Sequence, residues 1–325
     1  MPPCLPRSTQ RAGVQVNLIY DSVDSLFTPK QFFQQLVDVG ANMLEYNPIN
    51  PLQTRKVWQL NERDHRKLLV VDGRIAYVGG INISSVYSFG SFGSSFGHRT
   101  DDNKSQQKKD GLTWRDTHLR IEGPAVVKFQ RLCSWLPGKS RRAINMERGV
   151  GRAIGNSPSD PYSLMYVILI SVINSEESRV YLTNAYFLSD PQLLAALKDA
   201  AARGVDVRLL LSGKSDSDLA HQASCPFYDE LLRNGIKVYE RQNVLLHART
   251  ATIDGVWSTV GSINLDWRSR LNNQEIDAVM LGQDSGSRMQ TLFEQDLQAS
   301  KQITLKDWRN RSLILHIKEK WARLL

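Results

Sequence analysis

Cysteine is scarce in this sequence, and the three cysteines that occur are far apart in the chain. Cys4, Cys133 and Cys225 are odd in number and do not have the spacing of metal ligands. Scattered single thiols of this kind are typical of proteins that stay in a reducing compartment. The cysteines therefore argue against a small secreted domain held together by disulfides.

Long hydrophobic runs are also missing. The longest apolar stretches, such as "YVILI" and "VRLLL", are far shorter than the ~20 residues that a transmembrane helix needs. The first ten residues, "MPPCLPRSTQ", lack the apolar core of a secretory signal. The sequence accordingly predicts no transmembrane segment in this chain.

An excess of negative charge is absent as well, because 41 lysines and arginines outnumber 33 aspartates and glutamates, for a formal net charge of +8. With 41% hydrophobic and 23% charged residues, the 325-residue chain has the composition of a globular protein of one large or two ordinary domains. The basic balance indicates an anionic partner, either nucleic acid or an acidic lipid surface.

What the sequence does contain is a repeated frame. Residues 65–82, "HRKLLVVDGRIAYVGGIN", and residues 247–264, "HARTATIDGVWSTVGSIN", share a histidine, a base two residues later, Asp-Gly, a pair of small residues and a final asparagine. The base is Lys67 in the first copy and Arg249 in the second. One such frame alone would be typical of an ordinary hairpin with exposed polar side chains, whereas two at the same interval indicate a shared function.

The repeat extends into the surrounding sequence. "AGVQVNLIYDSVDS" (12–25) resembles "RGVDVRLLLSGKSD" (203–216), and "FFQQLVDVGANMLEY" (32–46) resembles "FYDELLRNGIKVYE" (227–240). Each copy indicates a buried strand and a polar loop, followed by an amphipathic helix and a second strand. Alternating strands and helices predict an α/β fold, here built as two pseudo-symmetric units.

The two units differ at their starts. The second opens with a strand and a long amphipathic helix in "SRVYLTNAYFLSDPQLLAALKDAAA", for which the first has no counterpart. Either the sheet edge is shorter in the first unit, or the chain is a shortened form of a longer protein. We expect an N-terminal unit over 1–136 that lacks its first strand and helix, a linker over 137–161, and a C-terminal unit over 162–325.

The repeated frame predicts a two-stranded hairpin with polar side chains on one face. The Asp-Gly pair signals a tight turn, and alternation along the preceding strand places His65 and Lys67 on the same face. Gly80 would let an anion approach the backbone closely, and Asn82 adds a neutral donor. This set suits a phosphate held beside an imidazole. The second copy offers the matching residues His247, Arg249, Ser262 and Asn264.

The motif aspartates are predicted to be structural. Asp72 follows His65 along the strand by a span of about 23 Å in extended chain. It cannot orient its own histidine from there, and the same holds for Asp254 in the second copy. We expect both aspartates to serve the turns in which they lie.

A second pair of carboxylates also occupies repeated positions. The aligned segments "WRDTHLRIEG" (114–123) and "NQEIDAVMLG" (273–282) match Asp116 with Glu275. A catalytic imidazole needs a partner for its second ring nitrogen, and these carboxylates are candidates for that role. The alternative is that both are surface carboxylates on a strand.

These residues give the chain a resemblance to the phospholipase D superfamily, which is defined by a duplicated H-x-K-x4-D motif followed by Gly or Ser and Asn. The resemblance covers nearly the whole chain. It comes closest to bacterial cardiolipin synthases, through segments such as "HRKLLVVDGRIAYVGGINIS" and "LLHARTATIDGVWSTVGSINLDWRS". It implies two phospholipase D-type α/β/α repeats packed around one shared active site. The sequence departs from the pattern at Arg249, where the family has lysine.

The resemblance also implies a mechanism, in which one histidine attacks phosphorus to form a phosphohistidine and the other protonates the leaving alcohol. By analogy we assign His65 as the nucleophile and His247 as the acid, although pseudo-symmetry permits the reverse. The bases, the asparagines and the small residues would bind the phosphate, while Asp116 and Glu275 match the histidine-orienting carboxylates of the family. No metal ion or other cofactor is implied, which agrees with the absence of carboxylate or cysteine clusters at ligand spacing.

The implied activity is that of a phosphatidyltransferase of the cardiolipin synthase type, which exchanges the alcohol of a phospholipid such as phosphatidylglycerol. Such an enzyme works at an anionic membrane surface, here expected to be the cytoplasmic side of the bacterial inner membrane, as a peripheral protein. An apolar stripe near the C-terminus suits either an interfacial helix or a core-packing helix. Its residues are Leu313, Ile317, Trp321 and Leu324.

Three other functions remain open at this stage. They are a phospholipase D-type hydrolase, a nuclease phosphodiesterase and an impaired homologue that binds lipid without turnover. The basic charge allows a nucleic-acid substrate, but no basic-aromatic groove pattern accompanies it, so nucleic acid is not favoured.

Overall fold

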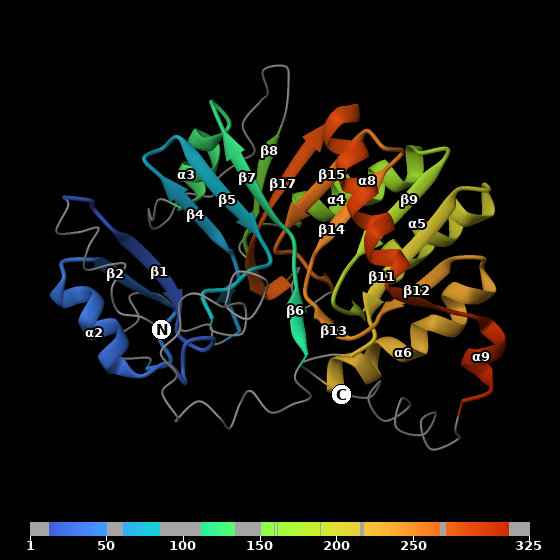
Figure 1. Cartoon of the computed structure of the whole chain (residues 1–325), viewed down its shortest axis with the longest axis horizontal. Helices are drawn as coiled ribbons and strands as arrows, with labels where there is room; N and C mark the ends of the chain where they lie inside the picture. Colours follow the sequence, from blue (N-terminus) through green and yellow to red (C-terminus); the bar gives the residue numbers. More distant parts are fainter. Residues whose placement is uncertain are drawn as a thin grey trace.

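The computed structural model shows strands and helices alternating along the chain, which confirms the predicted α/β fold (Figure 1). The N-terminal elements lie on one side of the molecule and most of the C-terminal elements on the other. The apolar stripe near the C-terminus lies outside the described residues. The structure describes residues 13–50, 61–84, 112–133, 151–158, 160, 162–188, 190–214, 218–266 and 271–311.

A large continuous sheet organises the C-terminal half. Its strands are β8 (Arg152–Asn156), β9 (Arg179–Thr183), β11 (Asp206–Ser212), β12 (Lys237–Arg241), β14 (Thr250–Ile253), β15 (Trp257–Gly261), β17 (Asn273–Leu281) and β18 (Ser300–Ile303). They lie in the order β18-β12-β11-β9-β14-β15-β17, and β8 pairs with the free edge of β17. Strands β9, β11 and β12 run parallel, whereas the remaining pairs are antiparallel.

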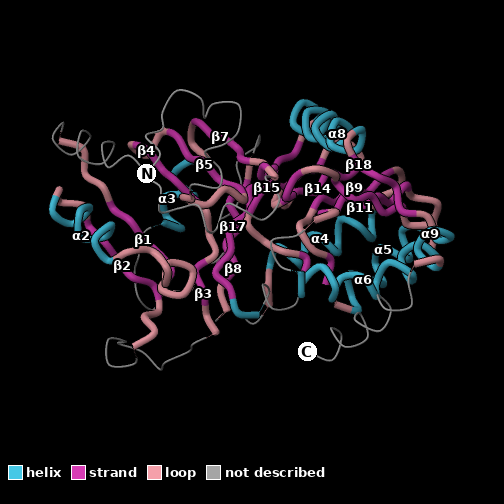
Figure 2. The backbone as a smooth tube through the Cα atoms, turned by 60° about the horizontal axis from the view of Figure 1, so that its bottom comes forward, coloured by secondary structure: helices cyan, strands magenta, loops and turns pink. Residues whose placement is uncertain are grey.

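Helices cover both faces of this sheet (Figure 2). Helices α4, α5 and α6 lie on one face, and α8 lies on the other. Helix α5 begins at Pro191, because the Asp190 carboxylate accepts hydrogen bonds from the backbone N–H groups of Gln192 and Leu193. The helices of this half are α4 (Leu164–Ser175), α5 (Pro191–Ala202), α6 (Asp218–Arg233), α8 (Gln283–Gln298) and α9 (Leu305–Arg309).

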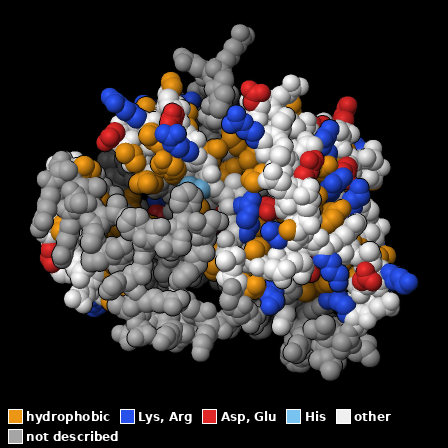
Figure 3. Space-filling view, viewed as in Figure 1, with side chains coloured by type: hydrophobic (Ala, Val, Ile, Leu, Met, Phe, Trp, Pro, Cys, Tyr) orange, Lys and Arg blue, Asp and Glu red, His pale blue; other side chains and the backbone are white. Residues whose placement is uncertain are grey.

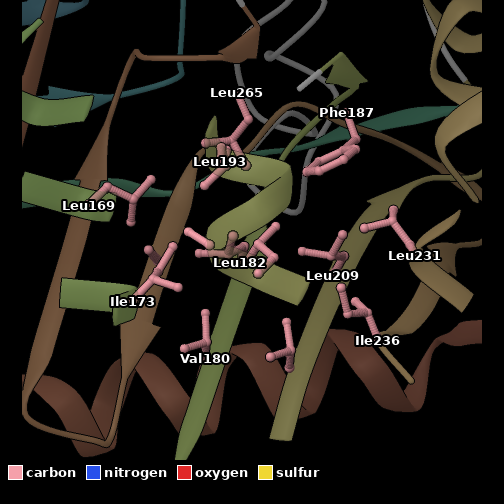
Figure 4. Close-up of a cluster of buried hydrophobic side chains, with 14 of the residues drawn as sticks. Leu169, Ile173, Val180, Leu182, Phe187, Leu193, Leu209, Leu231, Ile236 and Leu265 are labelled. Carbon is pink, nitrogen blue, oxygen red and sulfur yellow. The ribbon is translucent and has the colours of Figure 1, made fainter. Parts of the chain in front are cut away.

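The main hydrophobic core lies between this sheet and the helices α4, α5 and α6 (Figure 4). Burying one such side chain completely stabilises a fold by ~1.5–3 kcal/mol, so this cluster is a major source of stability. Its labelled members are Leu169, Ile173, Val180, Leu182, Phe187, Leu193, Leu209, Leu231, Ile236 and Leu265.

The N-terminal half contains two smaller sheets. Strands β1 and β2 pair in parallel and are connected by helix α2, while β4, β5 and β7 form an antiparallel sheet packed against helix α3. These elements are β1 (Asn17–Asp21), α2 (Lys30–Asp38), β2 (Asn42–Tyr46), β4 (Leu68–Val71), β5 (Ile75–Gly79), β7 (His118–Glu122) and α3 (Val126–Cys133).

The two small sheets are separate because no described strand joins them. By the sequence repeat, β1 corresponds to β11 and β4 corresponds to β14. In the C-terminal half β9 lies between β11 and β14 and links them. Within the described residues no strand occupies the equivalent place between β1 and β4, so the N-terminal half divides where the C-terminal half is continuous.

Both repeated frames form the predicted hairpins. Asp72 and Gly73 have φ values of 53° and 64°, and Asp254 and Gly255 have values of 48° and 70°. Positive φ at two consecutive positions is the geometry of the tight turn that Asp-Gly favours. The Arg74 N–H donates to the Val71 carbonyl at 3.0 Å to close the first turn, and an equivalent bond closes the second.

Part of the segment predicted to be a linker is ordered as a strand. Residues 152–156 form β8, which continues the large sheet beyond β17 through antiparallel pairing. A separate short parallel pair joins β10 (Phe187–Leu188) to β16 (Leu265–Asp266). Among the described residues no helix combines the length and the apolar character needed to cross a membrane.

Candidate active site

Two short parallel pairings connect the halves at the start of each frame. Strand β3 (Arg63–Asp64) pairs with the beginning of β17, and β13 (Val244–Leu246) pairs with β6 (Thr113–Arg115). The pairings continue into the histidines, because the His65 N–H donates to the Gln274 carbonyl at 3.0 Å and the His247 N–H donates to the Arg115 carbonyl at 2.8 Å. Each histidine is thereby placed beside the carboxylate-bearing segment of the other half.

The histidines and the carboxylates are paired across the halves. The Nδ1 atom of His65 lies 3.0 Å from both carboxylate oxygens of Glu275. The Nδ1 atom of His247 lies 2.9 Å from Oδ2 of Asp116. Each imidazole is therefore oriented by a carboxylate from the opposite repeat, and neither half contains a complete pair by itself.

Glu275 is held in its charged form despite complete burial. Burial alone would raise the pKa of this carboxyl, but the interaction with His65 and the charge of Lys67 lower the pKa to about 2. The amide of Asn273 also donates to Glu275 at 3.2 Å. A charged carboxylate can only accept, so the Nδ1 atom of His65 carries the proton and its Nε2 atom keeps a lone pair.

Burial favours the neutral form of both imidazoles. Burial, together with the nearby charge of Arg249, lowers the pKa of His247 to about 4, although Asp116 opposes this effect. Burial likewise lowers the pKa of His65 against the opposing effect of Glu275. Because both Lys67 and Arg249 influence the pKa of each histidine, the four groups lie within electrostatic reach of one another.

The two bases, Lys67 and Arg249, share one contact: each donates a hydrogen bond to the backbone carbonyl of its own histidine. The Nζ atom of Lys67 donates to the carbonyl of His65 at 2.7 Å, and a guanidinium nitrogen of Arg249 donates to the carbonyl of His247 at 2.9 Å. Both bases are buried. Burial and the neighbouring Arg249 lower the pKa of Lys67 to about 7, so the lysine is only partly charged near neutral pH.

Arg249 makes further contacts that the lysine does not. Its Nε donates to Oδ1 of Asn264 at 2.5 Å, and its second terminal nitrogen lies 3.0 Å from Nε2 of His247. In the first half the corresponding asparagine, Asn82, has an exposed side chain. The structure therefore brings Asn264 to its base but leaves Asn82 at the surface.

The small residues of the frames lie beside the orienting carboxylates. A Cβ atom on Gly80 would stand 2.3 Å from Oδ1 of Asp116, so no larger residue fits there. Ser262 is fully buried and its Oγ accepts from the Ile276 N–H at 3.0 Å, next to Glu275 in the chain. Gly80 and Ser262 therefore help to position the orienting carboxylates, a role that was not predicted from the sequence.

The motif aspartates lie at the turns, away from the imidazoles. The carboxylate of Asp254 accepts hydrogen bonds from the backbone N–H groups of Arg179 at 2.6 Å and Glu177 at 3.4 Å, so it ties its hairpin to the start of β9. Asp72 occupies the equivalent left-handed turn position in the first half.

One residue beside the site, Trp114, was not predicted from the sequence. The ring of Trp114 packs edge-on against the His247 imidazole, with centroids 5.2 Å apart and planes at 70°. In the repeat alignment Trp114 and Asn273 occupy matching positions, two residues before Asp116 and Glu275. Because tryptophan and asparagine differ in chemistry, the alignment did not indicate that these positions lie at the site. Among the described residues no three His, Cys, Asp or Glu side chains are grouped to hold a metal ion.

Fold and site together define a class of protein in which two α/β repeats exchange their orienting carboxylates around paired histidines. A family model, "Cardiolipin synthase, PLD-like domain", matches residues 169–297 of the chain. The chain also shares its fold with phosphatidylserine synthase of Haemophilus influenzae Rd KW20, at a TM-score of 0.67 and 12% sequence identity, covering 98% of this chain and 83% of that one.

Sequence relatives extend this similarity over almost the whole chain. A cardiolipin synthase of Listeria monocytogenes is 32% identical over 327 residues, which cover 96% of this chain and 64% of the relative. A cardiolipin synthase of Geobacillus is 30% identical, covering 97% of this chain and 62% of the relative. The chain thus spans a little under two thirds of the length of these curated relatives. The chain is thus similar to phospholipase D-like proteins over almost its whole length.

Proposed function

We propose that the chain is a phosphatidyltransferase of the cardiolipin synthase type, which exchanges the alcohol of a phospholipid through a phosphohistidine. The observation that carries this proposal is the pair of crossed histidine–carboxylate contacts, with Lys67 and Arg249 in electrostatic reach of both imidazoles. A phosphodiester needs a nucleophile, an acid and charge neutralisation on its free oxygens, and this set supplies all three.

His65 is the nucleophile in this proposal. Its Nδ1–H is held by Glu275, and its Nε2 has no hydrogen-bond partner among the residues that the structure describes. Its side chain is also more accessible than that of His247, at 17% against 9%. The Nε2 lone pair attacks phosphorus, a P–N bond forms, and the bond from phosphorus to the leaving alcohol oxygen breaks.

His247 handles the protons of both steps. When an anionic phosphate offsets the charges of Lys67 and Arg249, His247 takes up a proton on Nε2. It donates that proton to the leaving alkoxide, with Asp116 holding Nδ1 throughout. It then removes the proton of a second alcohol, whose oxygen attacks the phosphohistidine and releases His65. The exchange balances, because one alcohol replaces another and His247 regains the proton that it gave.

The cations bind the free oxygens of the phosphate. Lys67 and Arg249 are both buried, so their charges act in a low-dielectric setting where they are worth more than in water. Asn264 holds Arg249 through a direct hydrogen bond and so orients one of these charges.

Phosphatidylglycerol is the proposed substrate, with a second phosphatidylglycerol as the alcohol that accepts the phosphatidyl group. The sequence relatives that carry the name cardiolipin synthase support this choice. The chain would meet such lipids as a peripheral protein on the cytoplasmic side of the inner membrane.

Exposed apolar side chains and positive charge support binding to an anionic membrane surface. Figure 3 shows hydrophobic side chains gathered over β4 and β5, where Leu69 and Val71 are exposed. Phe27, in the loop after β1, is 88% exposed, and Ile83, just after the first frame, is 78% exposed. Exposed apolar side chains on a basic protein are suited to insertion at a lipid surface.

The test is a lipid assay on the purified full chain with vesicles of phosphatidylglycerol. The proposal expects cardiolipin and glycerol as products, and His65→Ala or His247→Ala should remove both products. Turnover that survives either substitution would refute the mechanism. Phosphatidic acid in place of cardiolipin would identify a hydrolase, and vesicle binding without any product would identify an impaired homologue.

A matched control separates loss of chemistry from loss of fold. Arg120→Ala removes a charged side chain that is 56% exposed on β7, outside the pairs described above. This variant should retain parental turnover, and its thermal unfolding midpoint should match that of the histidine variants if those remain folded.

A further inference from the structure

The strand pairings that align the histidines with their carboxylates are very short. Strand β6 pairs with β13 over three residues, and β3 pairs with β17 over two. Because neighbouring side chains of a strand point to opposite faces, a slip of one residue would turn Asp116 or Glu275 away from its imidazole. Pairings this short hold a register only weakly, so further contacts are needed to fix each carboxylate.

The residue directly before each carboxylate lies at the centre of such contacts. The carbonyl of Arg115 accepts the N–H of His247 at 2.8 Å, and the carbonyl of Gln274 accepts the N–H of His65 at 3.0 Å. Arg115 and Gln274 occupy matching positions in the repeat alignment. Any shift of either residue is therefore passed both to a histidine and to the carboxylate that follows in the chain.

Arg115 extends its side chain into the C-terminal half, which also carries His247. Its Nε and one terminal nitrogen donate to the two carboxylate oxygens of Asp296 in α8, at 3.1 and 2.8 Å. The other terminal nitrogen donates to Oγ1 of Thr117 at 3.2 Å and to the carbonyl of Asp116. A two-bond contact between a guanidinium and a carboxylate fixes direction as well as distance. Arg115 thus joins the segment that carries Asp116 to the half that carries His247.

The ion pair between Arg115 and Asp296 is largely withdrawn from water. The side chain of Arg115 is 22% exposed and that of Asp296 is 10% exposed. Arg241 also faces this carboxylate, with its Nε 3.5 Å from Oδ1. Ion pairs that are shielded in this way are screened less by salt than surface pairs, and removal of one partner is unfavourable. The contact is therefore suited to hold the register of β6.

Gln274 extends in the opposite direction, toward the half that carries His65. Its Nε2 donates to Oη of Tyr46, at the end of β2, and to Oγ of Ser157, which follows β8, both at 3.2 Å. The side chains of Arg115 and Gln274 thus cross between the halves as the carboxylates do. The contact is an ion pair on one side and a set of neutral hydrogen bonds on the other.

We propose that Arg115 and Gln274 are positioning residues of the site: each side chain anchors its segment in the half that owns the histidine, and so holds the following carboxylate against that imidazole. The effect on turnover rests on the proposed function, whereas the positioning itself precedes any reaction. Arg115 provides the stronger anchor, because hydrogen bonds between charged groups are roughly twice as strong as neutral ones.

The Nδ1–H proton resonances of the two histidines test this positioning without turnover. In Arg115→Gln the signal of His247 should shift or broaden through exchange with water, while the signal of His65 stays in place. Gln274→Met keeps the length of the side chain but removes its donor, and should change the His65 signal alone. The signals of the parent are assigned by their loss in His65→Gln and His247→Gln.

Two further variants separate positioning from general stability. Arg208→Gln removes an ion pair within β11 whose two side chains are each 26% exposed, close to the exposure of Arg115. Both Nδ1–H signals should stay in place in this variant, whatever the change in its thermal unfolding midpoint. Tyr46→Phe removes the acceptor of Gln274 in the N-terminal half, and should change the His65 signal in the same direction as Gln274→Met.

Kinetics on phosphatidylglycerol vesicles measures what the positioning contributes to turnover. Arg115→Gln should lower kcat by roughly 10–100-fold and leave KM within about threefold, because the imidazole is misplaced while the bases that bind phosphate are untouched. Arg115→Lys should recover part of the loss, because a lysine can keep one bond to Asp296. Gln274→Met should lower kcat by roughly 3–10-fold, as expected for a neutral hydrogen bond.

Three results would overturn the proposal. The first is an Arg115→Gln variant that unfolds at a lower temperature with the His247 signal unchanged, and the second is an equal shift of both histidine signals in either variant. The third is a parental kcat in Arg115→Gln when the parent makes cardiolipin. Failure of the proposed function looks different, because the crossed changes of the signals would still be seen while the parent gave no cardiolipin.

Discussion

The two halves of this molecule share a frame but differ in the chemistry that surrounds it. Among the described residues, Lys67 in the N-terminal half donates to the backbone carbonyl of its histidine. In the C-terminal half Arg249 contacts the backbone and the imidazole of His247 and also Asn264. The crossed carboxylates and the tight turns are common to both halves. The comparison teaches that a duplicated motif can keep its geometry while one change of base alters the contacts made in one copy.

The halves differ in construction as well. The C-terminal sheet is continuous and encloses the main hydrophobic core, while the N-terminal half consists of two small sheets with a much smaller buried cluster. Because the carboxylates are exchanged, the small half still supplies His65 to Glu275 and Asp116 to His247. The C-terminal half thus contributes most of the buried core, and the N-terminal half contributes residues that the site needs.

Removal of the orienting carboxylates should have the largest effect. Glu275→Gln and Asp116→Asn should each lower kcat/KM by on the order of 10²–10⁴-fold, because each imidazole loses the charge that fixes its tautomer. We expect the greater loss for Glu275→Gln, since Glu275 contacts His65 through both oxygens. Steady-state kinetics on phosphatidylglycerol vesicles measures both.

Glu122→Gln is the matched control for these variants, because Glu122 is a carboxylate on β7 that is 56% exposed. It should retain the kcat/KM of the parent within about twofold. If Asp116→Asn were as active as Glu122→Gln, the orienting role of Asp116 would be lost.

Truncations in the two cores compare the halves in stability. Leu209→Ala removes a fully buried side chain of β11 and should lower the free energy of unfolding by about 2–5 kcal/mol. Leu68→Ala, in β4, should cost less, because Leu68 is only partly buried against the smaller cluster. Urea denaturation followed by circular dichroism provides the measurement.

Leu69→Ala serves as the surface reference for these truncations, because Leu69 is 57% exposed on the same strand as Leu68. Its effect should stay within about 0.5 kcal/mol. Equal losses of unfolding free energy for Leu209→Ala and Leu68→Ala would contradict the conclusion that the C-terminal core contributes more to stability than the N-terminal cluster.

Exchange of the bases should have the smallest effect on rate. Arg249→Lys should raise kcat by roughly tenfold, because lysine restores the family pattern and with it the placement of the phosphate. A misplacement of about 1 Å can cost ~10²-fold in rate. Lys67→Arg should lower kcat by a similar factor, because the bulkier guanidinium sets the phosphate differently. An Arg249→Lys variant that is no faster than the parent would count against the comparison.

Many residues of this site could be predicted from the sequence. The repeated Asp-Gly pairs predicted both hairpins, since only residues tolerant of positive φ suit those turns. The repeated frames predicted the histidines and bases, and the aligned segments after them indicated Asp116 and Glu275 as a matched pair. Local patterns of this kind are readable because each depends on residues close together in the chain.

The rest depended on contacts between distant segments. The exchange of carboxylates follows from β3 and β13, strands of two and three residues that are too short to have a periodic pattern. Strand β8 was placed in a linker because its five residues, "RAIGN", lack the alternation of a strand and are ordered by pairing with β17. The contact of Arg249 with the His247 imidazole could not be predicted either, because it depends on the side-chain conformation of Arg249.

The exchange of the carboxylates between the halves is the central claim, and the Nδ1–H proton resonances of the two histidines test it most directly. In the Glu275→Gln variant the Nδ1–H signal of His65 should move upfield or disappear into exchange with water, while that of His247 stays in place. Asp116→Asn should produce the reverse. A Glu275→Gln variant that perturbs His247 and leaves His65 unchanged would contradict the account.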